Sequence, residues 1–336
     1  MVSKFPLDYM HLILLGVVRK LLYIWIAGPL QFRLQGHQVA LISQKMVEFK
    51  HYTPMEFSRK PRALEEFKYW KATEFRSLLL YFSVCAFRDV LPQRLYDSYL
   101  MLVCGMRILL HPLLSDMYHE YAGTLLHNFV ADCIQLYGKK VATYNMHATT
   151  HLAKEAAMYS LETISAFPFE NHLYQIKRML RKPGSTLVQI ISRIQERKLF
   201  GRKKEKEPRY KFIRPHTDGP LGNNCNDCFQ YDSVRFEGVT FSRNERDSCV
   251  KFEDSIGLIR NVLRKNDEGF CVLSLFRKNA DYFTYPVASS FVGIHAVETL
   301  TGNVTVAPVD ECTKCVLMPL RNDAFVAVQL CSAATL

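Results

Sequence analysis

The sequence predicts an α+β protein with an α-rich N-terminal region, a basic linker and a small β-barrel-like C-terminal domain. Before about residue 200, apolar residues recur every three or four positions, as in helices. After about residue 228 they alternate with a period near two, as in strands. The charged stretch 201–216 lies between the two patterns and has no apolar face. The 336 residues allow two or three domains.

Composition and charge exclude several classes of protein. With 49% hydrophobic and 22% charged residues the chain is in the globular range, which excludes wholesale disorder, and it has no collagen-like period or low-complexity tract. The net charge of +11 favours nucleic acid or an acidic surface as a partner. Of the ten cysteines, Cys85 and Cys104 lie in apolar runs, as buried free thiols do, which indicates a reducing compartment.

The α-rich region begins with an apolar segment at residues 9–28. Arg19 and Lys20 lie at its centre, where charge is most costly in a bilayer, so we expect a buried helix with a short polar edge and no membrane partner. Further helices are expected, with Pro92, His111-Pro112 and Gly138 marking their ends. These helices cover residues 70–90, 94–111 and 117–137, followed by one that has Pro168 in its first turn and runs to about Leu180.

The β-rich domain is expected to span residues 225–336, after a linker at 201–224. Its apolar alternation suits five to seven short strands. The clearest strand patterns lie at residues 234–241, 247–254, 257–263, 269–276 and 324–330.

Two spacings of polar residues suggest sites in the helical region. Asp8 and His11 are three residues apart on one helix face, so they could ligate a metal, or Asp8 could cap the helix with His11 partly buried. His147 and His151 have the i,i+4 spacing of zinc-binding helices. Ala148 stands where a metalloprotease has its glutamate, so polar histidines inside a helical core are expected.

A third candidate is the helix face that begins at Glu170. Tyr174, Lys177, Arg178 and Arg181 share this face, so one acid is followed by a basic stripe. The acid could hold a divalent cation and the basic residues could hold phosphates. The alternative is an ordinary exposed charged face.

The order of these motifs resembles the C-terminal half of transposases of the CACTA (En/Spm) type. Asp-x-Met-His is followed by Leu-Leu-Gly, then by Asn-Met-His-x-x-x-His-Leu, by Ser-Ala-Phe-Pro-Phe-Glu-Asn and by a basic helix. The resemblance covers residues 5–195, and the Phe-Pro-Phe-Glu-Asn block is its most specific part. The β-rich tail resembles the tail of such proteins more loosely.

The resemblance implies a partial RNase H-like core at 1–200 with a helical insertion at about 30–140. In such enzymes three acids bind two Mg²⁺ or Mn²⁺ ions that activate the nucleophile. Glu170 matches the third, catalytic acid, which would hold Mg²⁺, while Asp8 and His11 match an auxiliary motif. Asn171, His147 and His151 match the supporting blocks.

The chain departs from that family at its N-terminus. The first two catalytic aspartates and their strands should lie upstream of Asp8, so we expect a truncated, transposase-derived DNA-binding protein that is inactive alone. It would be nuclear, bind DNA and could form homo-oligomers. The alternative is a non-catalytic protein-interaction scaffold, domesticated from a transposon.

Basic stretches and paired cysteines complete the candidates. Two basic stretches are expected to contact phosphates, and the second could also serve in nuclear entry: Arg59, Lys60 and Arg62, and the linker residues Arg202, Lys203 and Lys204. Two Cys-x-x-Cys pairs, Cys225 with Cys228 and Cys312 with Cys315, could form a tetrahedral zinc site. Their separation exceeds the usual spacing of a zinc ribbon, and Cys315 could instead be a core thiol.

Overall fold

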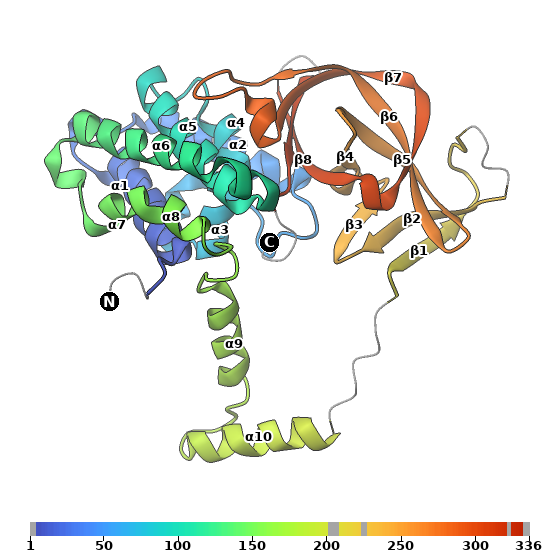
Figure 1. The fold of residues 1–336 in the computed structure, drawn as a ribbon, viewed down its shortest axis with the longest axis horizontal. Helices are drawn as coiled ribbons and strands as arrows, with labels where there is room; N and C mark the ends of the chain where they lie inside the picture. The colour runs from blue at the N-terminus through green and yellow to red at the C-terminus, as the bar shows by residue number, and fades with distance from the viewer. Residues whose placement is uncertain (1–4, 201–207, 223–226, 321–323, 332–336) are drawn as a thin grey trace.

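A computed structural model describes residues 5–200, 208–222, 227–320 and 324–331. The protein is α+β, with about 50% helix and 24% strand. A helical body lies beside a β-barrel, and two helices that follow the body form an arm standing away from both (Figure 1). From residue 5 to 200 the described chain contains helices and turns and no strand, so the predicted fold class is confirmed at the α+β level.

The first helix lies in the core of the body. It begins as a π-helix (η2, Met10–Val18) and continues as α1 (Arg19–Ala27). By length and composition, Met10–Ala27 is the one helix among the described residues that could cross a membrane, and half of it is buried in the protein. Arg19 is exposed and Lys20 donates a hydrogen bond to the Val141 carbonyl. The predicted buried helix with a polar edge is therefore confirmed.

The rest of the body is a bundle in which the predicted helix ends are confirmed. Pro92 precedes α5, the His111 ring accepts from the Leu114 amide at the start of α6, and Gly138 ends α6 with a φ of 79°. α6 begins at its Pro112, earlier than the predicted 117, and a kink at Tyr118 separates the extra turn. The α-helices are α2 (Gly36–Tyr52), α3 (Ala72–Ser77), α4 (Ser83–Phe87), α5 (Gln93–Leu110), α6 (Pro112–Tyr137), α7 (Tyr144–Ala148) and α8 (Leu152–Ala156).

Shorter helical segments join these helices. The segment η5 (Leu78–Phe82) is π-wound and makes α3, η5 and α4 nearly continuous, as the pattern at 70–90 predicted. The remaining segments are 3₁₀ turns: η3 (Leu30–Phe32), η4 (Leu64–Tyr69), η6 (Lys139–Val141) and η7 (Thr149–His151).

The arm consists of α9 (Phe167–Lys177) and α10 (Thr186–Phe200), and neither helix buries a residue. Pro168 lies in the first turn of α9, as predicted. The helix ends at Lys177, however, and not near Leu180. The Gln189 side chain accepts from the Arg181 amide and donates to the Lys182 carbonyl, so it binds backbone groups that a longer α9 would use. Arg181 therefore lies beyond the helix, in the turn to α10.

The barrel is antiparallel throughout. Its strands are β1 (Tyr210–His216), β2 (Phe229–Phe236), β3 (Val239–Ser242), β4 (Cys249–Phe252), β5 (Ser255–Lys265), β6 (Glu268–Asp281), β7 (Ile294–Pro308), β8 (Thr313–Pro319) and β9 (Ala324–Gln329). Following the pairings, β5, β4, β8, β9, β7 and β6 form a ring that closes where β6 pairs with β5. β2 adds to β5 and carries β1 and β3. Three 3₁₀ turns interrupt the strands: η8 (Glu245–Asp247), η9 (Ser289–Val292) and η10 (Val309–Glu311).

The predicted patterns at 257–263, 269–276 and 324–330 lie in β5, β6 and β9, and the middle of the pattern at 247–254 forms β4. The pattern at 234–241 is not one strand, because a turn at Glu237 and Gly238 separates β2 from β3. The barrel-like expectation agrees with the closed ring, but the described part of the chain has nine strands where five to seven were expected. The predicted linker at 201–224 is too long, because residues 210–216 form β1. The rings of Tyr210 and Phe212 give this basic segment an apolar face, and they pack against Phe236 and Tyr231 of β2. The domain thus begins before the predicted residue 225.

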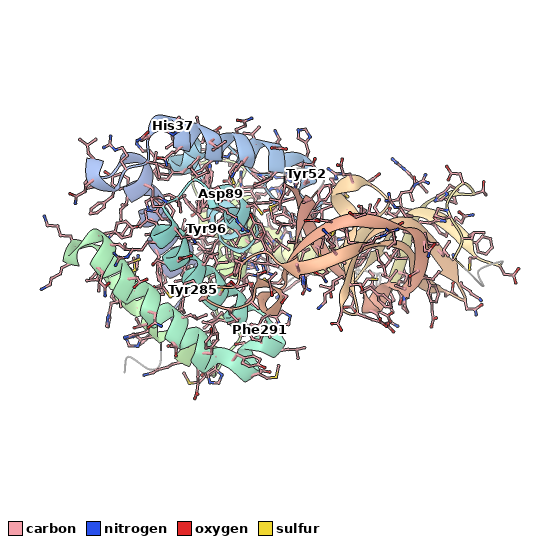
Figure 2. The ribbon with its side chains drawn as sticks, turned by 90° about the horizontal axis from the view of Figure 1, so that it is seen from above. His37, Tyr52, Asp89, Tyr96, Tyr285 and Phe291 are labelled. Carbon is pink, nitrogen blue, oxygen red and sulfur yellow. The ribbon has the colours of Figure 1, made fainter. Side chains whose placement is uncertain are left out.

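The body and the barrel share one hydrophobic core. Val316, Met318 and Val328 of the barrel pack with the helices of the body. The buried guanidinium of Arg107 in α5 donates to the carbonyls of Val292 and Gln329. The β6–β7 connection, which includes Tyr285 and Phe291, lies against α5 and α6 (Figure 2).

A buried ionic cluster lies at the same junction. Lys314 Nζ is 2.7 Å from Glu56 Oε2 and 2.6 Å from Asp247 Oδ1, and it donates to the Thr240 carbonyl. Glu56 follows α2, whereas the other three residues belong to the barrel. The Met55 amide also donates to Asp247. The cluster therefore fixes the chain after α2 against the barrel.

Candidate functional site

Asp8, His11 and Glu170 meet at the surface where the arm leaves the body. His11 Nδ1 lies 2.5 Å from Asp8 Oδ2, and His11 Nε2 lies 3.5 Å from Glu170 Oε1. The imidazole therefore stands between two carboxylates that are far apart in the sequence. The side chains of His11 and Glu170 are 57% and 56% exposed, so the site is open to a large ligand.

Asp8 connects the starts of two helices. Its carboxylate accepts from the amides of Met10 and His11, at the start of η2. Asp8 Oδ1 also accepts from the Ala166 amide at 2.9 Å, directly before α9. The capping role expected for Asp8 is confirmed. The partly buried position expected for His11 is wrong, because the Asp8 contact holds the ring at the surface.

A second, buried contact positions the segment that leads into α9. Arg76 Nη2 is 2.5 Å from Glu162 Oε1, and Arg76 Nε donates to the Tyr9 hydroxyl, which in turn donates to Glu162. The Tyr9 ring also packs against the Phe167 ring. Burial raises the pKa of Tyr9, so its hydroxyl stays protonated and can donate. These contacts position the start of α9, the helix that carries Glu170.

The carboxylates of this site do not together form a Mg²⁺ or Mn²⁺ chelate. Asp8 and Glu170 contact opposite nitrogens of one imidazole, so they face away from each other across the ring. The Asp8 carboxylate also accepts hydrogen bonds from three backbone amides. A two-metal site needs several carboxylates converging on the ions. No group of three potential ligands suited to a metal occurs in the described part of the chain.

The predicted basic face holds for Lys177 and Arg178, whereas Arg181 does not share it, because α9 ends at Lys177. Lys177 and Arg178 are exposed at the end of α9, and Arg181 is exposed in the turn that follows. The Arg178 guanidinium lies over the Tyr174 ring at 6.0 Å. Asn171 is exposed next to Glu170. From residue 167 to 200 the chain carries seven basic residues against two acidic ones, so the arm as a whole is positively charged.

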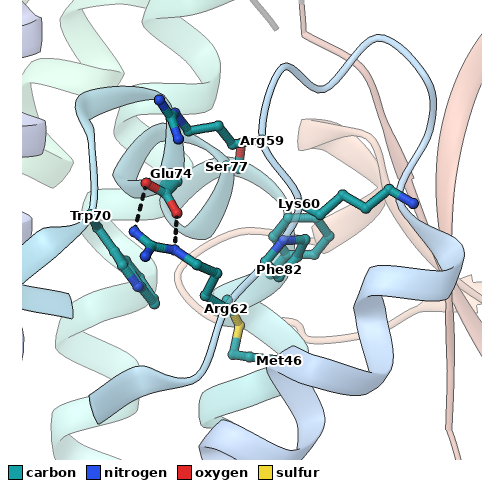
Figure 3. A pocket seen from close by; sticks show the side chains of 9 residues that line it. Met46, Arg59, Lys60, Arg62, Trp70, Glu74, Ser77 and Phe82 are labelled. Carbon is teal, nitrogen blue, oxygen red and sulfur yellow. Dashed lines mark hydrogen bonds and ion pairs between the residues drawn. The ribbon is translucent and has the colours of Figure 1, made fainter. Parts of the chain in front are cut away.

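The basic stretch Arg59, Lys60 and Arg62 lines a pocket beside α2 and α3 (Figure 3). Arg62 forms a fork-like ion pair with Glu74, with Nε 2.6 Å from Oε1. It also bonds Glu66, so Arg62 fixes the local fold and has little capacity left for a phosphate. Arg59, Lys60 and Lys50 line the outer hollow, of about 330 Å³, and leave it open to an anion.

The other histidines and cysteines lie apart from this site. His147 and His151 are both exposed, so the expectation of core histidines is wrong: the buried side of their segment is formed by Met146, Ala148 and Leu152. Cys312 packs beside Cys271 in one cluster of the barrel core, and Cys315 packs beside Cys249 in another. Cys315 is therefore a core thiol, as the alternative proposed.

Four predicted residues, Arg202, Lys203, Lys204 and Cys225, lie outside the described part of the chain. Cys85 and Cys104 are buried as predicted, and burial raises the pKa of each thiol to about 12.

Sequence reasoning missed the residues that support the site. Arg76 lies in an apolar helical run, so the sequence indicates a buried arginine that needs a partner. The run does not show that the partner is Glu162. Lys314, at the junction of body and barrel, stands inside an apolar strand and carries the same signal.

Comparison with known proteins finds the barrel alone. A family described as a domain of unknown function (DUF8592) matches residues 215–330. No match is found among curated proteins or among solved structures. The match begins near the end of β1 and covers β2 to β9, so the closed ring with β2 and β3 is the part of this chain that is similar to that family.

Proposed function

We propose that this chain is a transposase-derived, nuclear DNA-binding protein in which Glu170 is the surviving catalytic-site residue. The observation that carries the proposal is the contact of Glu170 with His11 and, through it, Asp8. These residues come from separate motifs of the resemblance to CACTA-type transposases, and they meet at the base of an exposed basic arm. The partial RNase H-like core belongs to the same proposal.

The arm supplies the DNA contact. Lys177, Arg178 and Arg181 are exposed, and none of them takes part in an ion pair among the described residues, so they are available for phosphates. A duplex carries one negative charge per roughly 1.7 Å of its axis, so a basic arm follows it without reading its sequence. Since the described carboxylates do not converge, the chain is expected to bind DNA without cleaving it.

The proposal is tested by DNA binding at several salt concentrations. Fluorescence anisotropy with labelled duplex DNA should give a log–log slope of about −0.9 per neutralised phosphate. The triple variant Lys177→Gln, Arg178→Gln, Arg181→Gln should bind more weakly and lose roughly three units of slope. The variant Lys68→Gln, Lys139→Gln, Lys140→Gln removes equal charge from exposed sites on the body and should bind as the parent does.

Two results would contradict the proposal. If the two triple variants weaken binding equally, the arm is not the DNA site and net charge alone explains the affinity. If the parent chain shows no affinity for DNA at low salt, the DNA-binding role is wrong. Strand cleavage by the isolated chain with Mg²⁺ or Mn²⁺ would contradict the inactive state that we propose.

One observation favours the alternative of a protein-interaction scaffold. Leu187, Ile191 and Ile194 recur at i, i+4 and i+7 along α10, and all three are exposed. An uncovered apolar stripe of this kind is typical of a helix that docks on a protein. A partner interaction that is insensitive to salt and is lost in Ile191→Asp, together with no DNA affinity, would favour this alternative.

A further inference from the structure

His147 and His151 face each other at the surface of the body. His147 belongs to α7, and His151 ends the 3₁₀ turn η7. Their Nε2 atoms are 3.4 Å apart, and their ring centroids are 5.1 Å apart with the rings nearly perpendicular. Both side chains are exposed, so neither is needed to fill the core. The two Nε2 atoms are therefore the closest polar atoms that the two rings offer each other.

The backbone holds this arrangement in place. Thr149 donates to the Asn145 carbonyl and Thr150 donates to the His147 carbonyl, both at 2.8 Å. Asn145 itself packs so closely on Gly16 of the first helix that a β-carbon there would lie 2.4 Å from its amide nitrogen. The turn between the two histidines is therefore fixed on one side to the core of the body.

The distance between the two nitrogens is that of a long hydrogen bond and also that of two ligands on one metal. A good N–H···N contact is expected near 3 Å, and 3.4 Å is long for one. Two imidazoles at about 2.0–2.1 Å from one tetrahedral ion have nitrogens roughly 3.3–3.4 Å apart. The observed separation is the bite of a chelating pair.

We propose that His147 and His151 form a two-histidine site for a divalent transition metal such as Zn²⁺, Ni²⁺ or Cu²⁺. Imidazole nitrogen suits these ions, whereas Mg²⁺ and Ca²⁺ prefer oxygen. No third histidine, cysteine or carboxylate completes the group within the described residues, so the remaining positions are open to water or to an added ligand. The metal would connect α7 to the turn that follows it and stabilise the folded chain by mass action.

The test uses the reduced full-length chain and Zn²⁺ alone. Isothermal titration should show binding that His147→Asn and His151→Asn each weaken about tenfold or more, because either change converts a chelate into a single ligand. Two controls should bind as the parent does: His37→Asn, an exposed histidine on α2, and Cys228→Ser, which removes a thiol that is not buried. Unchanged affinity in either variant of the pair, or loss of binding in Cys228→Ser, would overturn the proposal.

A spectroscopic measurement keeps the proposal testable if a variant alters the fold. The Cu²⁺ complex of the parent chain should show electron paramagnetic resonance splittings from two equivalent imidazole nitrogens. The His37→Asn chain should give the same spectrum. A parent spectrum with one nitrogen, or with sulfur coordination, would overturn the two-histidine site without reference to any substitution in it.

Discussion

Arg76 and Glu162 form an ion pair of 2.5 Å inside the body, and the Arg76 side chain is 1% exposed. The pair connects a helix of the body with the segment that leads into α9. Together with the contact between Asp8 and the Ala166 amide, it places Glu170 beside His11. The candidate site therefore depends on a buried charge that is remote from it in sequence.

Glu162→Gln should destabilise the protein substantially. The substitution leaves the buried Arg76 charge without its ion pair, which typically costs about 3 kcal/mol or more of the free energy of unfolding. Urea denaturation followed by circular dichroism measures this. The control Glu120→Gln, at an exposed position of α6, should change the free energy by less than about 0.5 kcal/mol. Equal effects in the two variants would mean that the pair is not required.

Lys314→Met should weaken the junction between body and barrel. It leaves the carboxylate of Glu56 buried without its cation and leaves Asp247 with Arg246 alone, at a cost of about 3–5 kcal/mol. Both tryptophans, Trp25 and Trp70, lie in the body, so fluorescence follows the body while circular dichroism follows the whole chain. The two unfolding curves should separate in this variant.

The triple variant Lys314→Met, Glu56→Gln, Asp247→Asn is the matched control for that experiment. It removes the uncompensated charges as well as the cation, so it should recover most of the lost stability. If the triple variant is as unstable as Lys314→Met alone, the loss comes from packing and not from charge.

Asp8→Ala should loosen the start of α9 more than the rest of the chain. The substitution removes the acceptor for Ala166 and for the first amides of η2, and loss of such a cap costs roughly 1–2 kcal/mol. Hydrogen exchange should become faster in a peptide covering residues 160–170. Asp8→Asn retains an acceptor oxygen and should show a smaller change. Unchanged exchange in the alanine variant would show that Asp8 does not hold the arm.

Stability should fall in mild acid because of His295. Burial, together with the nearby Lys251, lowers the pKa of His295 from its ordinary value of about 6.5 to about 4. The His295 ring forms a hydrogen bond with Asn279. The charge of Asp281 raises the pKa of His295 and the charge of Arg107 lowers it. As pH falls from about 7 to 4, the unfolded chain takes up a proton that the folded chain does not, so the free energy of unfolding decreases by roughly 3 kcal/mol.

His295→Gln tests this pH dependence, because glutamine can still donate to Asn279 and does not titrate. Urea denaturation at pH 7, 5.5 and 4.5 should show a flatter decline in the variant than in the parent. Parallel declines in the two proteins would assign the acid sensitivity to other groups.

Much of the local structure followed from the sequence. The helix ends at Pro92, His111 and Gly138 were predictable because these residues cap or interrupt a helix through their own chemistry. The strands at 257–263 and 269–276 were predictable because each is a short apolar run between turn residues, although residues 261–263 and 271–274 are buried in succession and do not alternate. Both signals are carried by neighbouring residues.

What the sequence by itself determined is which residues form each element and which side of it is apolar, since these depend on backbone sterics and local periodicity. The tertiary structure alone decided three things: that β6 closes the barrel against β5, that Arg76 pairs with Glu162, and that His11 stands between Asp8 and Glu170. Each of these is a contact between elements whose approach is set by how the whole core packs, and no local pattern records which distant charge a buried group will meet.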